Sequence, residues 1–382
     1  MKTHYDIAVI GAGVFGSWIA HQFRRAGTAV VLLDPYGPGN NRASSGGESR
    51  IMRMGYGADE IYTRSAERSL NLWRTLFEET DKSDLFRQTG VLWLARDNDA
   101  YSEATVATLQ RVGINFQRFT REELRQIYPE FELGPITWGI LEPDSGVLMA
   151  RQAVRAVVAD AQSNGLAYIP EAAVIPTGFK TINSLRTVAG TEIFANQFVF
   201  ACGAWLPKLF PDLLGELIHV TKQEVFFFGQ LADHDPHRRE LPAWIDFKDL
   251  VYGLPNLDNR GVKIAIDAHG ADFDPDTSDR LVSASSITAI RTFLAERLPQ
   301  LAHAPITETR VCQYENTSNG DFVIDRHPAH ENVWLVGGGS GHGFKHGPAV
   351  AEYVVQLLRG NRQTEPRFTL ATKRKLQDRE VY

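Results

Sequence analysis

A glycine-rich turn near the N-terminus constrains the fold of this chain more than any other feature. The segment YDIAVIGAGVFGSWIAHQFRRAGTAVVLLD, residues 5–34, reads as a strand, a turn, a helix that closes near Gly27 and a second strand. Elements in this order form a right-handed βαβ unit. The glycines Gly11, Gly13 and Gly16 have the spacing G-x-G-x-x-G, which allows a tight turn, close approach of a diphosphate and close packing of the helix on the strand.

An acidic residue completes this pattern at the end of the second strand. The carboxylate of Asp34 can bind both hydroxyls of an adenosine ribose and repels a 2′-phosphate. The helix N-terminus, at Val14 and Phe15, would present its positive end to the diphosphate. We therefore expect a dinucleotide cofactor, either FAD or NAD, and not NADP.

Later segments predict the remaining architecture. Residues 192–205, EIFANQFVFACGAW, read as a buried strand that ends at Gly203, and residues 331–360 read as a strand, a glycine loop and a helix. Both are expected in the nucleotide-binding sheet. Residues 89–97 and 241–270 read instead as strands and turns of a more antiparallel element. We therefore expect an α/β (α+β) fold with two domains built from non-contiguous segments.

Composition narrows the possible partners. The chain has 382 residues, of which 43% are hydrophobic and 23% charged, and no run approaches the length of about 18 apolar residues that spans a bilayer. The net charge of −6 comes without a basic block, which argues against nucleic acid and anionic membranes as partners. Asp6 interrupts the N-terminal apolar run, so we expect no secretory signal. Small molecules are the expected partners, and no metal site is expected.

The two cysteines, Cys202 and Cys312, imply no disulfide framework and favour a reducing cytoplasm. Cys202 lies in a buried strand pattern and is interpreted as a packing residue. Cys312 stands beside a polar residue and Tyr314, just before another strand-like run, so any task it has is expected to be chemical.

Several short motifs carry a resemblance to a known family. They are GAGVFG (11–16), SSGGESRIMRMGYG (44–57), ACGAW (201–205), VYGLP (251–255), GVKIAI (261–266), FDPDT (273–277), CQY (312–314), DFVID (321–325) and SGHGFK (340–345). Together they resemble the sarcosine oxidase branch of the D-amino-acid oxidase family, nearly end to end. The resemblance implies a glutathione-reductase-type FAD fold, with a Rossmann-like FAD-binding domain and a mostly antiparallel substrate domain. The FAD-binding domain is expected in residues 1–80, 150–220 and 320–382, and the substrate domain in residues 81–149 and 221–319.

The resemblance also implies how FAD is bound. Sarcosine oxidases of this family hold FAD covalently through a cysteine sulfur at the flavin 8α position, and the residue that matches here is Cys312. The cofactor-binding residues implied by the resemblance are Gly11, Gly13, Val14, Phe15, Gly16, Asp34, Ser44, Ser45, Arg50, Gly203, Trp205, Cys312, Gly341, His342, Gly343 and Lys345.

The substrate site follows from the same resemblance. Arg53 and Lys345 match residues that grip the substrate carboxylate, and an arginine fork with a nearby ammonium suits that task. Tyr252 and Tyr314 match two tyrosines that form the walls of the substrate pocket.

Three further positions bear on the reaction. Arg50 and His342 match residues beside the flavin ring. Lys263 matches a lysine over the flavin face, where a fixed cation can stabilise developing superoxide, and this favours an oxidase over a dehydrogenase. One departure concerns the substrate: where sarcosine oxidase has an active-site histidine, this chain has Asp267, with His269 two residues further on. An inward Asp267 would suit a substrate with a second basic group.

The sequence thus predicts a cytoplasmic, monomeric FAD-dependent oxidase that acts on secondary, N-methyl or N-alkyl amino acids. It would form an imine and reduce O2 to hydrogen peroxide, while FAD supplies the redox chemistry. One alternative is a flavin-dependent dehydrogenase, or an oxidase of a primary or cyclic amine. A more distant alternative is a redox-silent dinucleotide-binding protein with the same fold.

Overall fold

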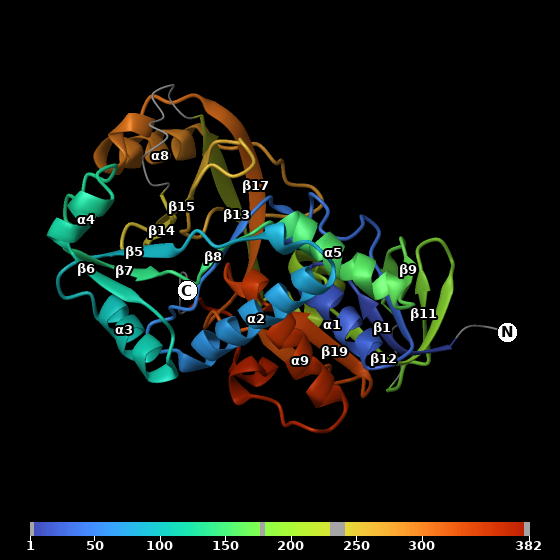
Figure 1. Cartoon of the computed structure of the whole chain (residues 1–382). Helices are drawn as coiled ribbons and strands as arrows, with labels where there is room; N and C mark the ends of the chain where they lie inside the picture. The colour runs from blue at the N-terminus through green and yellow to red at the C-terminus, as the bar shows by residue number, and fades with distance from the viewer. Residues whose placement is uncertain (1–3, 176–179, 230–240, 378–382) are drawn as a thin grey trace.

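A computed structural model describes residues 4–175, 180–229 and 241–377 of the chain (Figure 1). Two large sheets lie toward opposite ends of the molecule in this view, and the long strands β13 (Ile218–Phe228) and β17 (Ile306–Thr317) form one edge of the second sheet, near the middle of the molecule. Among the described helices, none is both long and apolar enough to cross a membrane.

The first sheet has the parallel core that the N-terminal pattern predicts. Its strands are β1 (His4–Ile10), β2 (Val30–Leu33), β9 (Ala167–Ile169), β10 (Ala173–Val174), β11 (Ser184–Thr187), β12 (Glu192–Phe200), β18 (Val323–Arg326) and β19 (Val333–Gly337). β1 pairs in parallel with β2 and β12, β2 with β9, and β12 with β19. Ile10 lies opposite both Leu33 and Phe200, and Phe200 lies opposite Leu335. The carboxyl ends of four strands are therefore level, and ligands of such sheets bind at this edge.

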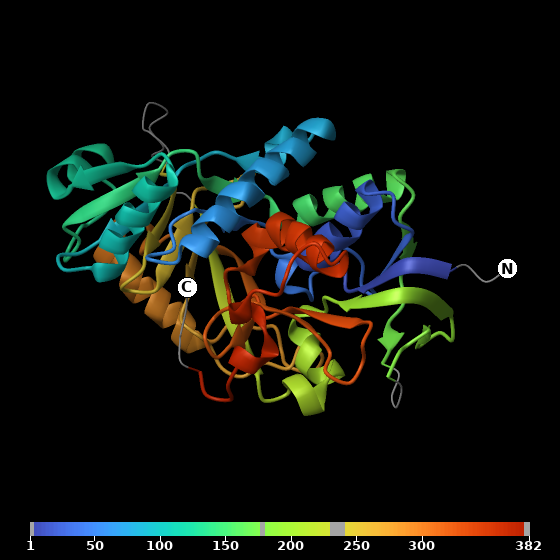
Figure 2. The same cartoon turned by 90° about the horizontal axis from the view of Figure 1, so that it is seen from below.

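Helices cover this sheet. α1 (Val14–Arg25) packs against α5 (Ala150–Ser163) and α9 (Gly347–Leu358), and Figure 2 shows α1 and α5, in blue and green, on the same side of β1. Each helix places an apolar side inward, with Trp18 and Ile19 of α1 and Val354 of α9 almost fully buried. α2 (Glu60–Glu79) packs against α9 and against α3 (Ala100–Val112). The short helices α6 (Leu206–Leu209) and α7 (Pro211–Leu214) follow β12.

The second sheet is mostly antiparallel, as the sequence predicts. Its order is β17-β13-β16-β15-β14-β5-β7-β6, and only β14 and β5 pair in parallel. The strands not yet given are β5 (Val91–Ala95), β6 (Gln117–Thr120), β7 (Trp138–Glu142), β14 (Ala243–Asp246), β15 (Val251–Leu254) and β16 (Val262–Ile266). α8 (Ala284–Arg297) contacts β16, and α4 (Arg121–Ile127) contacts β6 and β7. Apolar residues such as Phe226, Trp244 and Leu294 form a separate core here.

A small third sheet lies between these parts. β8 (Gly146–Leu148) pairs with both β3 (Arg50–Met52) and β4 (Phe86–Arg87). β3 brings Arg50, and the loop that follows it brings Arg53, from the N-terminal part of the chain. The predicted fold class is confirmed. The division into two domains stays a prediction, and β13 crosses its proposed boundary at residue 220. β12 ends at Phe200 and not at Gly203, because Gly203 has a φ of 52° and begins a 3-10 turn.

Candidate active site

A cavity of about 280 Å3 lies at the carboxyl ends of the parallel strands. Its floor is the glycine turn after β1. Gly11 has a φ of 102°, and a Cβ there would lie 2.5 Å from the carbonyl oxygen of Ala201. A Cβ on Gly16 would lie 1.9 Å from the oxygen of Gly11. Only glycine fits these two positions, because a side chain would push the turn away from β12 or from α1.

Asp34 lies at the end of β2 on the wall of this cavity. Its carboxylate accepts hydrogen bonds from the backbone N–H groups of Ala12 (2.8 Å), Tyr36 (2.8 Å) and Gly37 (3.0 Å). These bonds fix the carboxylate beside the glycine turn, although burial raises its pKa. Burial alone would disfavour a carboxylate here, so its place in the wall fits a ligand that offers hydroxyl donors. The residues present therefore fit the adenosine ribose of FAD.

Most of the predicted cofactor residues share this cavity. The predicted residues that line it are Gly11, Gly13, Val14, Phe15, Asp34, Ser44, Ser45, Arg50, Gly203, Trp205, Cys312, Gly341 and Gly343. Gly16 packs behind the turn, and His342 and Lys345 line a neighbouring cavity instead. Two polar atoms bear on ligand binding: the Val14 N–H donates to Ser45 Oγ over 3.0 Å, and the buried Ser44 Oγ has no hydrogen-bond partner among the described residues.

Cys312 lies beside a cation, whereas Cys202 does not. The guanidinium of Arg50 donates a hydrogen bond to Cys312 Sγ over 3.1 Å and another to the oxygen of Ser44 over 2.7 Å. Cys202 Sγ donates to the oxygen of Ile10 over 3.3 Å, and burial raises the pKa of this thiol. A thiolate is the reactive form of cysteine and is favoured by a neighbouring positive charge. Of the two thiols, Cys312 is the one that lies at hydrogen-bond distance from a guanidinium.

A smaller cavity of about 80 Å3 adjoins the first. The residues that line both are Arg50, Cys312, Tyr314, Ser340, Gly341 and Phe344. The smaller cavity also contains every predicted substrate residue, namely Arg53, Lys345, Tyr252, Tyr314 and Asp267, together with Lys263 and His342. The structure thus brings the two predicted groups of residues together from strands and loops that are distant in sequence.

Arg53 and Lys345 are both buried, at 6% and 5% exposure. The Arg53 guanidinium lies over the rings of Tyr56 and Trp93, at 4.3 and 4.9 Å from their centroids, and donates to the oxygen of Gly55. Lys345 Nζ donates to Tyr56 Oη over 2.7 Å. Burial and the Arg53 charge lower the pKa of Lys345. An anion between the two cations would offset the repulsion between them and raise the pKa of Lys345, so their arrangement suits a carboxylate.

Glu142 holds the Arg53 loop and was not predicted from the sequence. This buried carboxylate, at the end of β7, accepts hydrogen bonds from the N–H groups of Met54 (2.7 Å) and Gly55 (3.0 Å) and from Trp93 Nε1 (2.7 Å). It fixes the loop and one of the two aromatic rings on which Arg53 lies. The only sequence signal is a single acidic residue that ends an otherwise apolar strand.

Lys263, on β16, is 3% exposed and reaches the smaller cavity. Its Nζ donates to the backbone oxygen of Ser49 over 2.8 Å. Burial, and next the charge of Arg50, lower the pKa of Lys263 to about 7. A lysine in a strand is ordinarily solvated, so this inward position is a feature that tertiary contacts create. With this pKa, the Lys263 amino group can gain or lose a proton near neutral pH.

Asp267 points into the smaller cavity and is bound by Tyr314, whose hydroxyl donates to it over 2.6 Å. Burial raises the pKa of Asp267 to about 6, despite this bond and the charges of Arg53 and Lys345. Tyr252 is hydrogen-bonded to Tyr314, and burial raises the pKa of both phenols, which therefore stay protonated. His269 does not line the smaller cavity. The strand register therefore places Asp267, and not His269, at the position where sarcosine oxidase has its active-site histidine.

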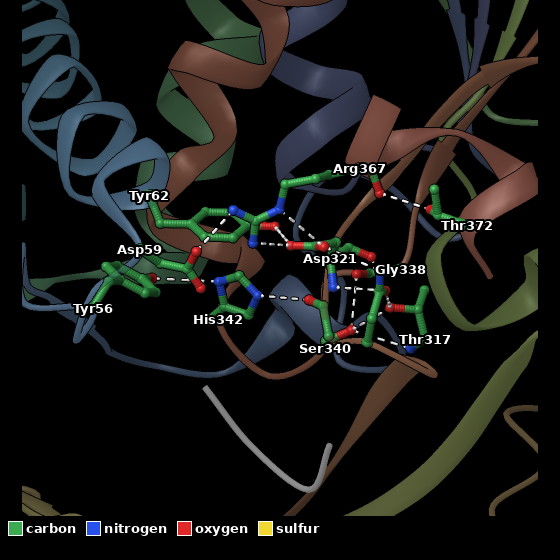
Figure 3. Close-up of polar contacts among 12 residues, drawn as sticks. Tyr56, Asp59, Tyr62, Thr317, Asp321, Gly338, Ser340, His342, Arg367 and Thr372 are labelled. Atoms are coloured by element: carbon green, nitrogen blue, oxygen red, sulfur yellow. Dashed lines mark hydrogen bonds and ion pairs between the residues drawn. The ribbon is translucent and has the colours of Figure 1, made fainter. Parts of the chain in front are cut away.

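A polar network extends from the smaller cavity toward the helices (Figure 3). Tyr56 Oη, which accepts from Lys345, lies 2.7 Å from His346 Nε2 and 3.4 Å from His342 Nδ1. His342 Nε2 donates to the oxygen of Gly320 over 3.0 Å, which leaves Nδ1 as an acceptor. Burial lowers the pKa of His346, which is therefore neutral. Neither Tyr56 nor His346 was predicted from the sequence to belong to the site.

The turn that binds His342 is itself fixed by the C-terminal segment (Figure 3). Asp321 accepts hydrogen bonds from Tyr62 Oη (2.8 Å) and Arg367 Nη2 (2.7 Å). Arg367 Nη1 also donates to Asp59 over 2.8 Å. Residues that are distant in sequence therefore hold one histidine of the site in place.

Comparisons with known proteins agree with this geometry. Monomeric sarcosine oxidase from Bacillus sp. (strain NS-129) is 31% identical over 366 residues, which are 94% of this chain and 93% of that protein. Peroxisomal sarcosine oxidase from Homo sapiens is 28% identical, over 93% of this chain and 92% of its own. N-methyl-L-tryptophan oxidase from Shigella dysenteriae serotype 1 is 25% identical, over 91% and 93%.

Solved structures share the fold at lower identity. L-proline dehydrogenase from P. horikoshii superposes with a TM-score of 0.84 at 22% identity, over 97% of this chain and 98% of its own. NikD, an amino acid oxidase of nikkomycin biosynthesis, superposes with a TM-score of 0.79 at 21% identity, over 96% and 98%. Residues 6–357 match the DAO family model, described as FAD dependent oxidoreductase. The chain therefore belongs to the DAO family of FAD-dependent oxidoreductases.

Proposed function

We propose that this protein is an oxidase that converts secondary, N-methyl or N-alkyl amino acids to imines and reduces O2 to hydrogen peroxide. The observation that carries the proposal is the smaller cavity, which adjoins the larger one at Arg50 and Cys312 and is lined by the buried cations Arg53, Lys345 and Lys263. The names of the relatives support the substrate class, since they are sarcosine oxidases and an N-methyl-L-tryptophan oxidase.

Some of the cavity residues bind the substrate, and another stabilises developing charge. Arg53 and Lys345 bind the substrate carboxylate, which orients the amine toward the shared wall of the two cavities. Tyr252 and Tyr314 form a side wall of the smaller cavity. FAD would be held by the residues of the larger cavity and would supply the redox chemistry between the amine and O2. Lys263 holds a positive charge beside the place where superoxide develops.

The attachment of FAD is assigned to Cys312. Its sulfur lines both cavities and lies 3.1 Å from the Arg50 guanidinium, which donates a hydrogen bond to it. Cys202 also lines the larger cavity, but its thiol donates to Ile10 and stays protonated. We propose a covalent bond between FAD and Cys312 Sγ, and no bond to Cys202.

The position of Asp267 in the smaller cavity suggests which amino acids the enzyme prefers as substrates. A carboxylate beside two cations would bind a second basic group of the substrate, while Arg53 and Lys345 bind the substrate carboxylate. In Asp267→Asn, we expect a KM at least tenfold higher for an N-methylated diamino acid and an unchanged KM for N-methylated alanine. If the KM rises equally for both substrates, Asp267 binds the α-amine that all substrates share, and the preference for a second basic group is wrong.

One experiment tests the function as a whole. We expect peroxide formation and oxygen consumption with N-methyl or N-alkyl amino acids, and weaker activity with primary or cyclic ones. A dehydrogenase would reduce an artificial acceptor with the same amines but would consume little oxygen. A redox-silent protein would show no loss of the yellow absorbance with any amine under anaerobic conditions, and this result would overturn the proposal.

We also propose that the protein acts as a monomer in a reducing compartment such as the cytoplasm. The compartment is suggested by Cys202 and Cys312, neither of which forms a disulfide. The oligomeric state is suggested by the monomeric sarcosine oxidases among its relatives. Light scattering of the purified holoenzyme would measure it directly.

A further inference from the structure

Glu315 is a buried carboxylate in the wall of the larger cavity. It is 8% exposed and lies on β17, three residues after Cys312. Its Oε1 accepts a hydrogen bond from the Gly339 N–H over 3.3 Å, and the Gly338 N–H also stabilises the carboxylate. Its Oε2 has no hydrogen-bond partner among the residues that the structure describes. A buried carboxylate oxygen without a donor is costly, so a ligand is the expected source of one.

Two glycines lie beside Glu315 Oε2, so no side chain from these positions covers it. A Cβ on Gly203 or on Gly337 would lie 3.5 Å from Oε2, and these glycines follow or end the parallel strands β12 and β19. The carboxylate therefore lies where dinucleotides bind in a sheet of this type. Two acidic groups lie near it: the Cys202 thiol, and Asp34 beyond that thiol. Burial raises the pKa of Glu315 to about 7.

The chemistry of the site selects one part of FAD. The carboxylate repels a diphosphate and cannot donate while it is ionised, so it requires a hydrogen-bond donor. The hydroxyls of the adenosine ribose already have a carboxylate partner in Asp34, which lines the same cavity. Three residues of a strand span about 10 Å, so Glu315 lies between the flavin end of the cavity at Cys312 and the diphosphate end at Gly11. The ribityl chain of FAD joins these two ends and carries hydroxyls.

We propose that Glu315 Oε2 accepts a hydrogen bond from a ribityl hydroxyl of FAD. The assignment depends on FAD binding and not on the amine that the enzyme oxidises. It gives this acidic residue, which no sequence motif singled out, a role in seating the cofactor, because the bond would fix the ribityl chain between the two glycine loops.

The test compares the affinities of FAD and of FAD analogues that each lack one ribityl hydroxyl. It uses the full chain with Cys312→Ser, so that binding is reversible, and flavin fluorescence reports the Kd. We expect one analogue to bind about tenfold or more weakly than FAD. With Glu315→Ala added, FAD itself should bind about tenfold or more weakly, and that analogue should bind as well as FAD. Glu308→Ala, on the same strand but outside both cavities, is the matched control and should change neither value.

The pH dependence supplies a second readout. A hydroxyl donor binds the ionised carboxylate better, so FAD affinity should rise with pH through about 7 and this rise should be absent in Glu315→Gln. Thermal unfolding of the apoproteins checks that both Glu315 variants fold; Glu315→Gln keeps the side-chain volume if Glu315→Ala does not fold. Equal FAD affinity in the Glu315 and Glu308 variants would overturn the proposal. So would an affinity that falls as pH rises, since a protonated Glu315 would then donate to the diphosphate.

Discussion

Arg50 Nη2 lies 3.1 Å from Cys312 Sγ, although 262 positions separate the two residues in sequence. The same guanidinium donates to Ser44 and Ser49, so its position is fixed from three sides. The pair lies where the two cavities meet. The first prediction depends on this pair.

We expect the purified protein to be yellow and the colour to stay with the polypeptide after acid precipitation. Cys312→Ser should release all flavin into the supernatant, whereas Cys202→Ser should retain it. Arg50→Met should slow attachment at least tenfold, because the thiolate loses its cation. Flavin fluorescence of the pellet measures each case. Free flavin from the wild-type protein would show that FAD is not covalently bound.

Arg53→Met and Lys345→Met should each weaken the binding of carboxylated substrates and of acetate-like inhibitors. A hydrogen bond to a charged group contributes about 1.5–3 kcal/mol, which corresponds to about 10- to 100-fold in Kd. Titration of the flavin absorbance with small carboxylates measures this effect. Arg125→Met, an exposed arginine of α4, is the control and should leave the Kd unchanged. Equal spectral shifts in all proteins would place the carboxylate site elsewhere.

Lys263→Met should separate the two half-reactions. Anaerobic reduction by the amine should fall only modestly, whereas reoxidation by O2 should fall about 100- to 1,000-fold, because a preorganised charge next to the developing superoxide is lost. Stopped-flow absorbance of the reduced enzyme mixed with aerated buffer measures this rate. Lys222→Met, on the neighbouring strand β13, is the control. Reoxidation that is as fast in Lys263→Met as in the wild type would contradict the assignment.

The rate of reoxidation should also depend on pH. Burial and Arg50 lower the pKa of Lys263 to about 7, so the ammonium is present below that pH and is lost above it. A negatively charged reduced flavin would raise this pKa. We therefore expect the rate to fall as pH rises through a midpoint at or above about 7. Lys263→Arg should remove the midpoint, since arginine stays charged.

Asp321→Asn should lower the free energy of unfolding by about 1.5–3 kcal/mol, because it weakens charge-assisted bonds to Arg367 and Tyr62. Urea unfolding of the holoenzyme measures the loss. Arg367→Gln should account for much of the same energy in a double-mutant cycle. Glu103→Gln breaks an exposed pair with Arg118 and should cost less than about 1 kcal/mol. An additive cycle would mean that Asp321 and Arg367 do not stabilise each other.

The sequence alone determined the local features. The glycine spacing and the apolar strands on either side predicted the βαβ unit, because only glycine permits the φ of Gly11 and the close approach of Gly16. The family motifs pointed to many of the residues that line the two cavities, including Cys312. These features depend on local backbone conformation and on short motifs, and therefore they can be read from the chain itself.

The tertiary structure decided what those residues touch. Strand pairing places Lys263 in the interior, where burial lowers its pKa to about 7. The packing of β3 near β17 also brings Arg50 within hydrogen-bond distance of Cys312. Glu142 and Glu315 lie in segments whose local pattern marks them only as single acidic residues among apolar or polar neighbours. Their roles come from burial and from backbone N–H groups that distant loops supply. Burial and hydrogen bonding between distant segments are properties of the packed chain, so no local pattern can predict them.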